Sequence, residues 1–354
     1  NEDDGNLLSK LYKEIVTDAD WENWESAYGR YLKVTAFDFS QVQTNIYAVV
    51  NQGNLDSAIK LVDRWSTLST KYKYRQEYRD FELIRAWVFQ TKKQYSEAEK
   101  VYRDLLKEDP SNYNIHWQLG LMYLTSENLI KALPEFAFVK DNMSEYAFGH
   151  GMYGWTLIKL GRFKASEEHT EKAYMLDSND ATYAMNYGHS LTLLRKYTKA
   201  RKYYLKALEN AGATSVFDEG IIADFDFFIE NGWEVEQVNR EKTHLTSQWN
   251  KHFKYKALGN EYFTKGQGLE KQEQHLQAGL AFDTAIAFEH KGNYVRYGLL
   301  RNYHRWSAYN YYKHEDYNTS LQRYMTSWNI NLKHINDPEL EMDDLEMISN
   351  LNDW

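Results

Sequence analysis

A pattern of small and bulky residues recurs every 34 residues in the middle of the chain. Three glycines mark it, and each is followed at constant distances by a second small residue and then by a larger one. The three sets are Gly120, Ala132 and Phe136; Gly154, Ser166 and Thr170; and Gly188, Ala200 and Tyr204. The same spacing carried backward reaches Ala86, Ala98, Tyr102 and Pro110. A spacing kept over four units predicts a stack of helix pairs, in which small residues let two helices approach closely.

The residues around each glycine also follow a recognisable order. The three stretches are Leu119-Gly120-x-x-Tyr123, Tyr153-Gly154-x-x-Leu157 and Tyr187-Gly188-x-x-Leu191. This order resembles the tetratricopeptide repeat, whose pattern is Trp-x-x-Leu-Gly-x-x-Tyr, then Ala-x-x-x-Phe, then Pro, with a period of 34. The resemblance implies an all-α chain, folded as a right-handed superhelical solenoid of antiparallel helix pairs.

The composition agrees with a helical chain. Only 3 Pro and 18 Gly occur among 354 residues, whereas residues that favour helices are abundant. The 42 Lys and Arg against 51 Asp and Glu give a net charge of -9, without a dense basic block to follow a phosphate backbone. We therefore expect no nucleic acid partner. Charged residues also interrupt every apolar stretch before the roughly 18 residues that a membrane span needs.

Two features bear on the cell compartment. The chain has no cysteine, which excludes disulfides, cysteine-ligated zinc and thiol nucleophiles. It also begins at Asn1 rather than at methionine, as it would after removal of a signal or anchor segment. Together these features favour an extracytoplasmic bacterial protein, periplasmic or anchored to a membrane through a removed N-terminal segment. A cytoplasmic protein is the alternative.

The repeat spacing divides the chain into five expected segments. The first is a polar, acidic tether, the second and fourth are divergent helix pairs, the third is the regular array, and the fifth is a capping helix. Their ranges are 1–6, 7–78, 79–214, 215–334 and 335–354. In the fourth segment the repeat signature returns as Leu258-Gly259-x-x-Tyr262. We expect an insertion near 266–271 to follow it, with Gly266 and Gly268 in a flexible linker.

The repeat glycines should lie at helix crossings rather than in ligand-binding loops. Gly120, Gly154, Gly188 and Gly259 each fall inside an expected helix, where glycine costs roughly 1 kcal/mol relative to alanine. Close helix approach would offset that cost. Replacing Gly188 with Leu should therefore destabilise the fold by overpacking.

The sequence shows no catalytic motif. It lacks His-Glu-x-x-His, Gly-x-Ser-x-Gly and a glycine loop that could cradle phosphates. His314-Glu315-Asp316 reads as a solvated turn between two helices, since adjacent turn residues rarely converge on one ion. We therefore predict no enzyme activity, no catalytic or metal-binding residues and no cofactor.

The resemblance also implies a binding surface. In tetratricopeptide repeats the inner surface is lined by the second, fifth, ninth and twelfth residues of each unit. Family members that grip a free C-terminal carboxylate use Lys, Asn and Arg at these places, whereas this chain has mostly apolar and aromatic residues there. The candidate partner-binding groove consists of Leu83, Trp87, Trp117, Leu121, Phe148, Trp155, Met185 and His189.

These residues lead to a functional hypothesis with alternatives. An aromatic groove suits an extended peptide or an amphipathic helix of a partner protein, so we predict a non-enzymatic protein–protein interaction scaffold. The same aromatic residues could instead pack only against the neighbouring repeat. Stacked Trp and Tyr would also suit a glycan-binding or glycan-processing protein, although a catalytic carboxylate pair is not evident. A third alternative is a structural subunit that self-associates.

Overall fold

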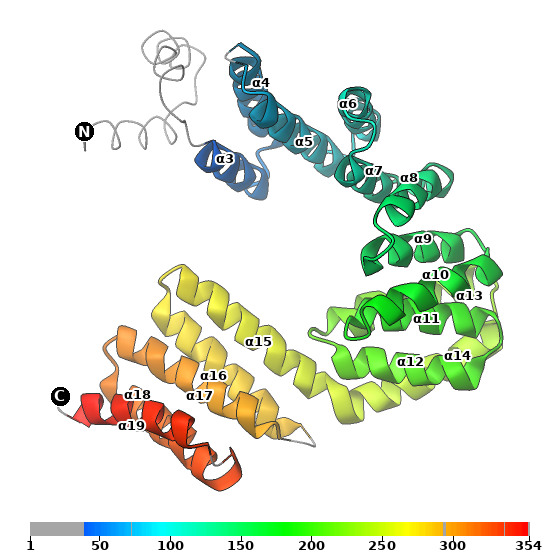
Figure 1. Ribbon diagram of the computed structural model, residues 1–354. Helices are drawn as coiled ribbons and strands as arrows, with labels where there is room; N and C mark the ends of the chain where they lie inside the picture. The colour runs from blue at the N-terminus through cyan, green and yellow to red at the C-terminus, as the bar shows by residue number, and fades with distance from the viewer. Residues whose placement is uncertain (1–38, 72, 293–294, 336, 353–354) are drawn as a thin grey trace. The chain divides into compact units, whose positions relative to one another are not determined.

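The described part of the chain is built from helices. A computed structural model describes residues 39–71, 73–292, 295–335 and 337–352 (Figure 1). Every regular element in these ranges is helical, which confirms the all-α prediction. The expected tether at 1–6 and the start of the next segment, up to residue 38, lie outside the described residues. Contacts divide the chain into two units, Asn1–Ser144 and Glu145–Trp354.

The described residues of the first unit form three consecutive helix pairs. The helices described there are α3 Ser40–Asn51, α4 Leu55–Lys71, α5 Arg75–Thr91, α6 Tyr95–Glu108, α7 Tyr113–Thr125 and α8 Leu129–Asn142. The core of the first two pairs is apolar, with Ile46, Val62 and Phe81 almost fully buried. Helix α4 has 17 residues and is longer than α6 and α8, which have 14 residues each.

The second unit begins with two regular pairs and continues with divergent ones. Its α-helices are α9 Ala147–Lys159, α10 Phe163–Leu176, α11 Ala181–Leu193, α12 Tyr197–Asn210, α13 Ala223–Glu230, α14 Val235–Gln248, α15 Lys254–Lys271, α16 His275–Lys291, α17 Tyr297–Lys313, α18 Tyr317–Ile330 and α19 Pro338–Asn352. Three π-helical runs join them, η2 Val216–Ile222, η3 Trp249–Phe253 and η4 Asn331–Ile335. Because η3 has helical backbone angles at both ends, α14 runs into α15 without a turn.

Side chains at the helix starts explain several boundaries. Asn112 accepts a hydrogen bond from the backbone N–H of Ile115 at the start of α7, and Asn128 accepts one from Lys131 at the start of α8. Asp180 caps α11 in the same way. Each cap satisfies a backbone donor that has no partner inside the helix.

The repeat glycines lie where the two helices of a pair cross. A Cβ built on Gly120 would lie 2.7 Å from the ring of Phe136, and one on Gly188 would lie 2.8 Å from the ring of Tyr204. At Gly154 the neighbour is Thr170, at 2.7 Å. All three glycines are buried inside helices, as predicted. We call this position of each first helix the crossing position.

The expected insertion near 266–271 is wrong. Helix α15 is continuous from Lys254 to Lys271 and includes both Gly266 and Gly268. Gly266 occupies the crossing position, because its Cβ would lie 2.6 Å from the ring of Phe282. Gly259 is also buried in α15, but its nearest neighbour would be the carbonyl oxygen of Ala285 at an ordinary 3.6 Å.

The turn between paired helices supports this assignment. In the regular pairs a residue with positive φ lies seven positions after the crossing position, as at Glu127, Gly161 and Arg195. Glu273 follows Gly266 by the same seven positions, and Glu315 follows Ala308 in the last pair. The sequence around Gly259 therefore resembles the repeat signature but lies before the crossing position, which is Gly266. No residues are inserted in this repeat.

Candidate functional site

Half of the predicted groove residues lie in the first unit and are partly buried there. They are Leu83 and Trp87 on α5, and Trp117 and Leu121 on α7. The Trp87 ring lies 5.3 Å from that of Tyr47, and Trp117 meets Phe136 edge-on at 5.7 Å. Part of the surface of each tryptophan is therefore packed against a neighbouring helix.

Two predicted groove residues in the second unit are covered by the chain itself. His189 is fully buried, with Nδ1 2.9 Å from the hydroxyl of Tyr204 and Nε2 3.1 Å from a carboxylate oxygen of Asp224 on α13. Met185 is also buried, with its sulfur against Gly220 of η2. Because η2 and α13 pack on this face of α11, the expected exposure of Met185 and His189 to a partner is wrong.

The other two predicted residues of the second unit are partly buried on α9. The ring centres of Trp155 and His189 lie 5.9 Å apart, and those of Phe148 and Tyr146 lie 6.0 Å apart. The eight predicted residues thus come from both units, and a common channel formed by Leu83, Trp87, Trp117, Leu121, Phe148 and Trp155 stays a prediction.

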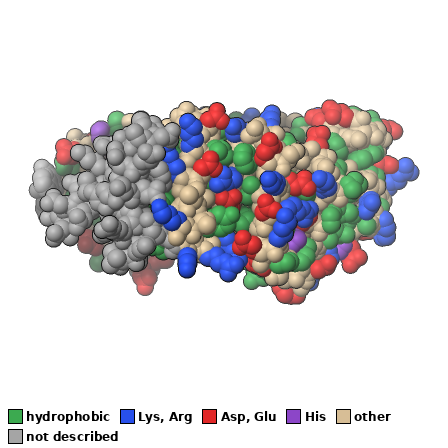
Figure 2. All heavy atoms as spheres, turned by 90° about the horizontal axis from the view of Figure 1, so that it is seen from above, with side chains coloured by type: hydrophobic (Ala, Val, Ile, Leu, Met, Phe, Trp, Pro, Cys, Tyr) green, Lys and Arg blue, Asp and Glu red, His purple; other side chains and the backbone are tan. Residues whose placement is uncertain are grey.

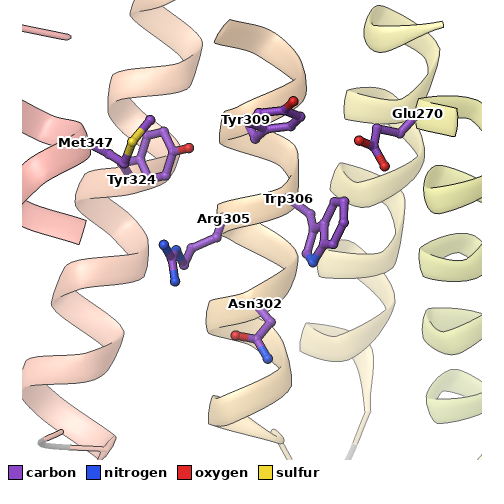
Figure 3. A pocket seen from close by; sticks show the side chains of 7 residues that line it. All are labelled: Glu270, Asn302, Arg305, Trp306, Tyr309, Tyr324 and Met347. Carbon is purple, nitrogen blue, oxygen red and sulfur yellow. The ribbon is translucent and has the colours of Figure 1, made fainter. Parts of the chain in front are cut away.

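A pocket of about 440 Å³ lies at the other end of the second unit (Figure 3). Four helices contribute to it, and α17 forms its centre. Its lining residues are Glu270 from α15, Asn302, Arg305, Trp306 and Tyr309 from α17, Tyr324 from α18 and Met347 from α19. This volume is in the range of small-ligand and side-chain binding pockets.

Helical spacing explains why one face of α17 supplies four lining residues. Arg305 and Trp306 lie three and four residues after Asn302, and Tyr309 lies four and three residues after those two, which places all four on one side of a helix. Trp306 packs against two other aromatic rings of the unit. The centre of its ring lies 5.7 Å from the ring centre of Phe282 and 6.2 Å from that of Phe263. The aromatic floor of the pocket is therefore fixed by packing inside the unit.

A buried carboxylate holds the wall of the pocket that faces α18 and α19. Asp344 of α19 is fully buried and lies 3.0 Å from a guanidinium nitrogen of Arg301, while Ser327 donates a hydrogen bond to it. The Nε of Arg305 lies 3.1 Å from the other oxygen of Asp344. Burial also raises the pKa of Tyr324 to about 12, so its hydroxyl is neutral at ordinary pH.

These residues occupy the places that the resemblance assigns to an inner surface. With Ala308 at the crossing position, Asn302, Arg305 and Tyr309 are the second, fifth and ninth residues of the last repeat. With Gly266 at the crossing position, Glu270 is the twelfth residue of the preceding one. Sequence reasoning missed Glu270 because it placed the signature glycine at 259, and it missed the others because it did not carry the inner-surface places into the last repeat. The distances from Gly266 to Ala278 and Phe282, identical to those of the regular repeats, could have found Glu270.

The comparisons with known proteins agree with the fold. Residues 85–137 match a family model described as tetratricopeptide repeat, and residues 149–180 and 181–214 match a second model with the same description. This chain contains tetratricopeptide repeats over these residues. No curated protein matches it in sequence. The matched repeats include the regular pairs, and the pocket lies beyond them along the chain.

Two solved structures are similar to parts of this chain. A tetratricopeptide repeat protein from Parabacteroides merdae is 14% identical, with a TM-score of 0.46 over 76% of this chain and 98% of the other. MamA from Desulfovibrio magneticus, from residue 41 to its end, is 16% identical, with a TM-score of 0.42 over 50% of this chain and 97% of the other. Both TM-scores are below 0.5, so the assignment of tetratricopeptide repeats depends on the two family models alone.

Other kinds of site find little support within the described residues. No group of three or more His, Asp or Glu side chains there could hold a metal ion. His314, Glu315 and Asp316 form the turn between α17 and α18, where Asp316 caps α18. None of the described helices is both long and apolar enough to cross a membrane. On the described part of the face in Figure 2, acidic and basic side chains are interspersed.

Proposed function

We propose that this chain binds a peptide segment of a partner protein in the pocket over α17. The tetratricopeptide repeats support a general role as a protein interaction scaffold. The observation that carries the finer proposal is the position of the pocket, because residues from the inner-surface places of two successive repeats meet there. A segment lying across α17 would contact both.

The chemistry of the lining supports a peptide ligand. Trp306 and Tyr309 offer large aromatic surfaces, and Met347 offers a flexible apolar side chain that adapts to its ligand. Asn302 is exposed at the edge, where its amide can bind backbone groups of an extended chain. Aromatic anchors with a polar rim are typical of protein interfaces.

Selection from a random peptide library tests this proposal. The library is displayed on phage and panned against the whole chain, and selected peptides are measured against wild type and two variants. Tyr309→Ala should weaken binding by about 2 kcal/mol, because it removes a ring from the pocket. Tyr297→Ala is the matched control, since this exposed tyrosine of α17 lies outside the pocket.

The outcome is decided by affinity and melting temperature together. Peptides that depend on Tyr309 but not on Tyr297, with both variants as stable as wild type, support the proposal. Failure to select peptides, or binding of an oligosaccharide panel that Tyr309→Ala abolishes, would contradict it and favour the glycan-binding alternative. An extracytoplasmic location remains a separate proposal, which fractionation of the native cells would test.

A further inference from the structure

We infer that the pocket receives a basic side chain, Lys or Arg, of the bound segment beside Glu270. This inference rests on the proposed function and adds the chemistry of the partner. Figure 3 shows Glu270 and Trp306 on the side of the pocket toward α15, and Arg305 on the side toward α18 and α19. The two sides of the pocket therefore differ in charge.

Glu270 is a carboxylate without a counter-charge of its own. It lies in the last turn of α15, and no hydrogen bond or ion pair involves its side chain within the described residues. The C-terminal end of a helix carries a partial negative charge, which disfavours a carboxylate there. A cation from a partner would offset both the partial negative charge of the helix end and the charge of the Glu270 carboxylate.

The aromatic rings next to Glu270 also favour a cation. Ammonium and guanidinium groups are attracted to the faces of Trp and Tyr rings. Tyr309 already has such a neighbour, because Lys313 Nζ lies 5.5 Å from the centre of its ring. Trp306 lines the pocket beside Glu270, so a basic side chain could meet a carboxylate and an indole face together.

The described positively charged side chains near the pocket do not pair with Glu270, so its carboxylate can bind a basic group of a partner. Arg301 and Arg305 share the buried Asp344 of α19, and Figure 3 shows Arg305 on the opposite side of α17 from Glu270. Lys313 is exposed at the solvent end of α17 and makes no ion pair with Glu270. An acidic partner residue would have to compete with Asp344 for the two arginines. The geometry therefore favours a base at Glu270 over an acid at Arg305.

The test uses the selected peptides and one charge-neutralising substitution. Each peptide is compared with a version in which its basic residue is replaced by norleucine, and both are titrated into wild type, Glu270→Gln and Glu273→Gln. Glu273 is the matched control, because it is exposed in the next turn and does not line the pocket. It reports the general attraction of basic peptides to a chain with a net charge of -9.

We expect Lys or Arg to be enriched at one position of the selected peptides. Replacing that residue with norleucine should weaken binding to wild type by about tenfold, and should have little effect on binding to Glu270→Gln. Glu273→Gln should bind like wild type. Peptides that depend on Tyr309 without any basic preference would overturn this inference while the proposed function stands. Equal losses in Glu270→Gln and Glu273→Gln would overturn it as well, because they would show only long-range attraction.

Discussion

His304 is a buried histidine whose charge the structure opposes. It lies on α17, and its Nδ1 has no hydrogen-bond partner within the described residues. Burial lowers its pKa to about 4, and the nearby Arg323 adds to the effect. The neutral imidazole is therefore the form that the folded chain accommodates.

This shift predicts a pH dependence of stability. Between pH 6.5 and about 4 the unfolded chain binds a proton at His304 that the folded chain does not, so stability is lost as the pH falls through this window. The loss should reach up to about 3 kcal/mol. His304→Gln should lose less than wild type in urea titrations at pH 7 and pH 4.5, whereas His314→Gln, in an exposed turn, should follow wild type. Parallel curves for wild type and His304→Gln would show that the shift is absent.

Single residues also show where prediction from the sequence was limited. The crossing glycines could be predicted, because the same spacing fixes glycine and its partner in three successive pairs. Exposure of Met185 and His189 could not, because it depends on how η2 and α13 pack after a degenerate stretch. The sequence pattern of one repeat does not predict which of its side chains the next element will cover.

At the scale of the element, α15 shows how a helix can be misread. Two glycines near its C-terminal end suggested a linker, yet the helix continues through both. Gly266 is needed because the ring of Phe282 occupies the space of a Cβ, and that ring is fully buried against Phe263 and Trp306. Gly268 has nothing within 4 Å of its Cβ position. The two glycines therefore differ only in what packs against them, and the sequence alone does not show that difference.

Alanine substitutions at these two positions should have opposite effects. Gly266→Ala should reduce the free energy of unfolding by about 1 to 2 kcal/mol, because overpacking outweighs the gain in helix propensity. Gly268→Ala should raise it by up to about 1 kcal/mol, since only the helix propensity changes. Urea denaturation of both variants checks this. A flexible linker at 266–271 would instead make both substitutions nearly neutral.

At the scale of the whole molecule, the repeats and the candidate site belong to different stretches. The family matches end at residue 214, whereas the pocket is lined by residues 270 to 347. The sequence therefore predicted helix pairs and an interaction role from its regular middle. The pocket could not be predicted in the same way, because it needs the correct crossing position in α15 and a contribution from α19.

The most direct test of the account locates the bound peptide. One selected peptide is titrated by calorimetry into wild type, Tyr309→Ala of the second unit and Trp117→Ala of the first. We predict that Tyr309→Ala weakens binding by about 2 kcal/mol or more, while Trp117→Ala leaves the affinity within about 0.5 kcal/mol of wild type. The opposite result, a large loss with Trp117→Ala and none with Tyr309→Ala in equally stable variants, would contradict a site over α17.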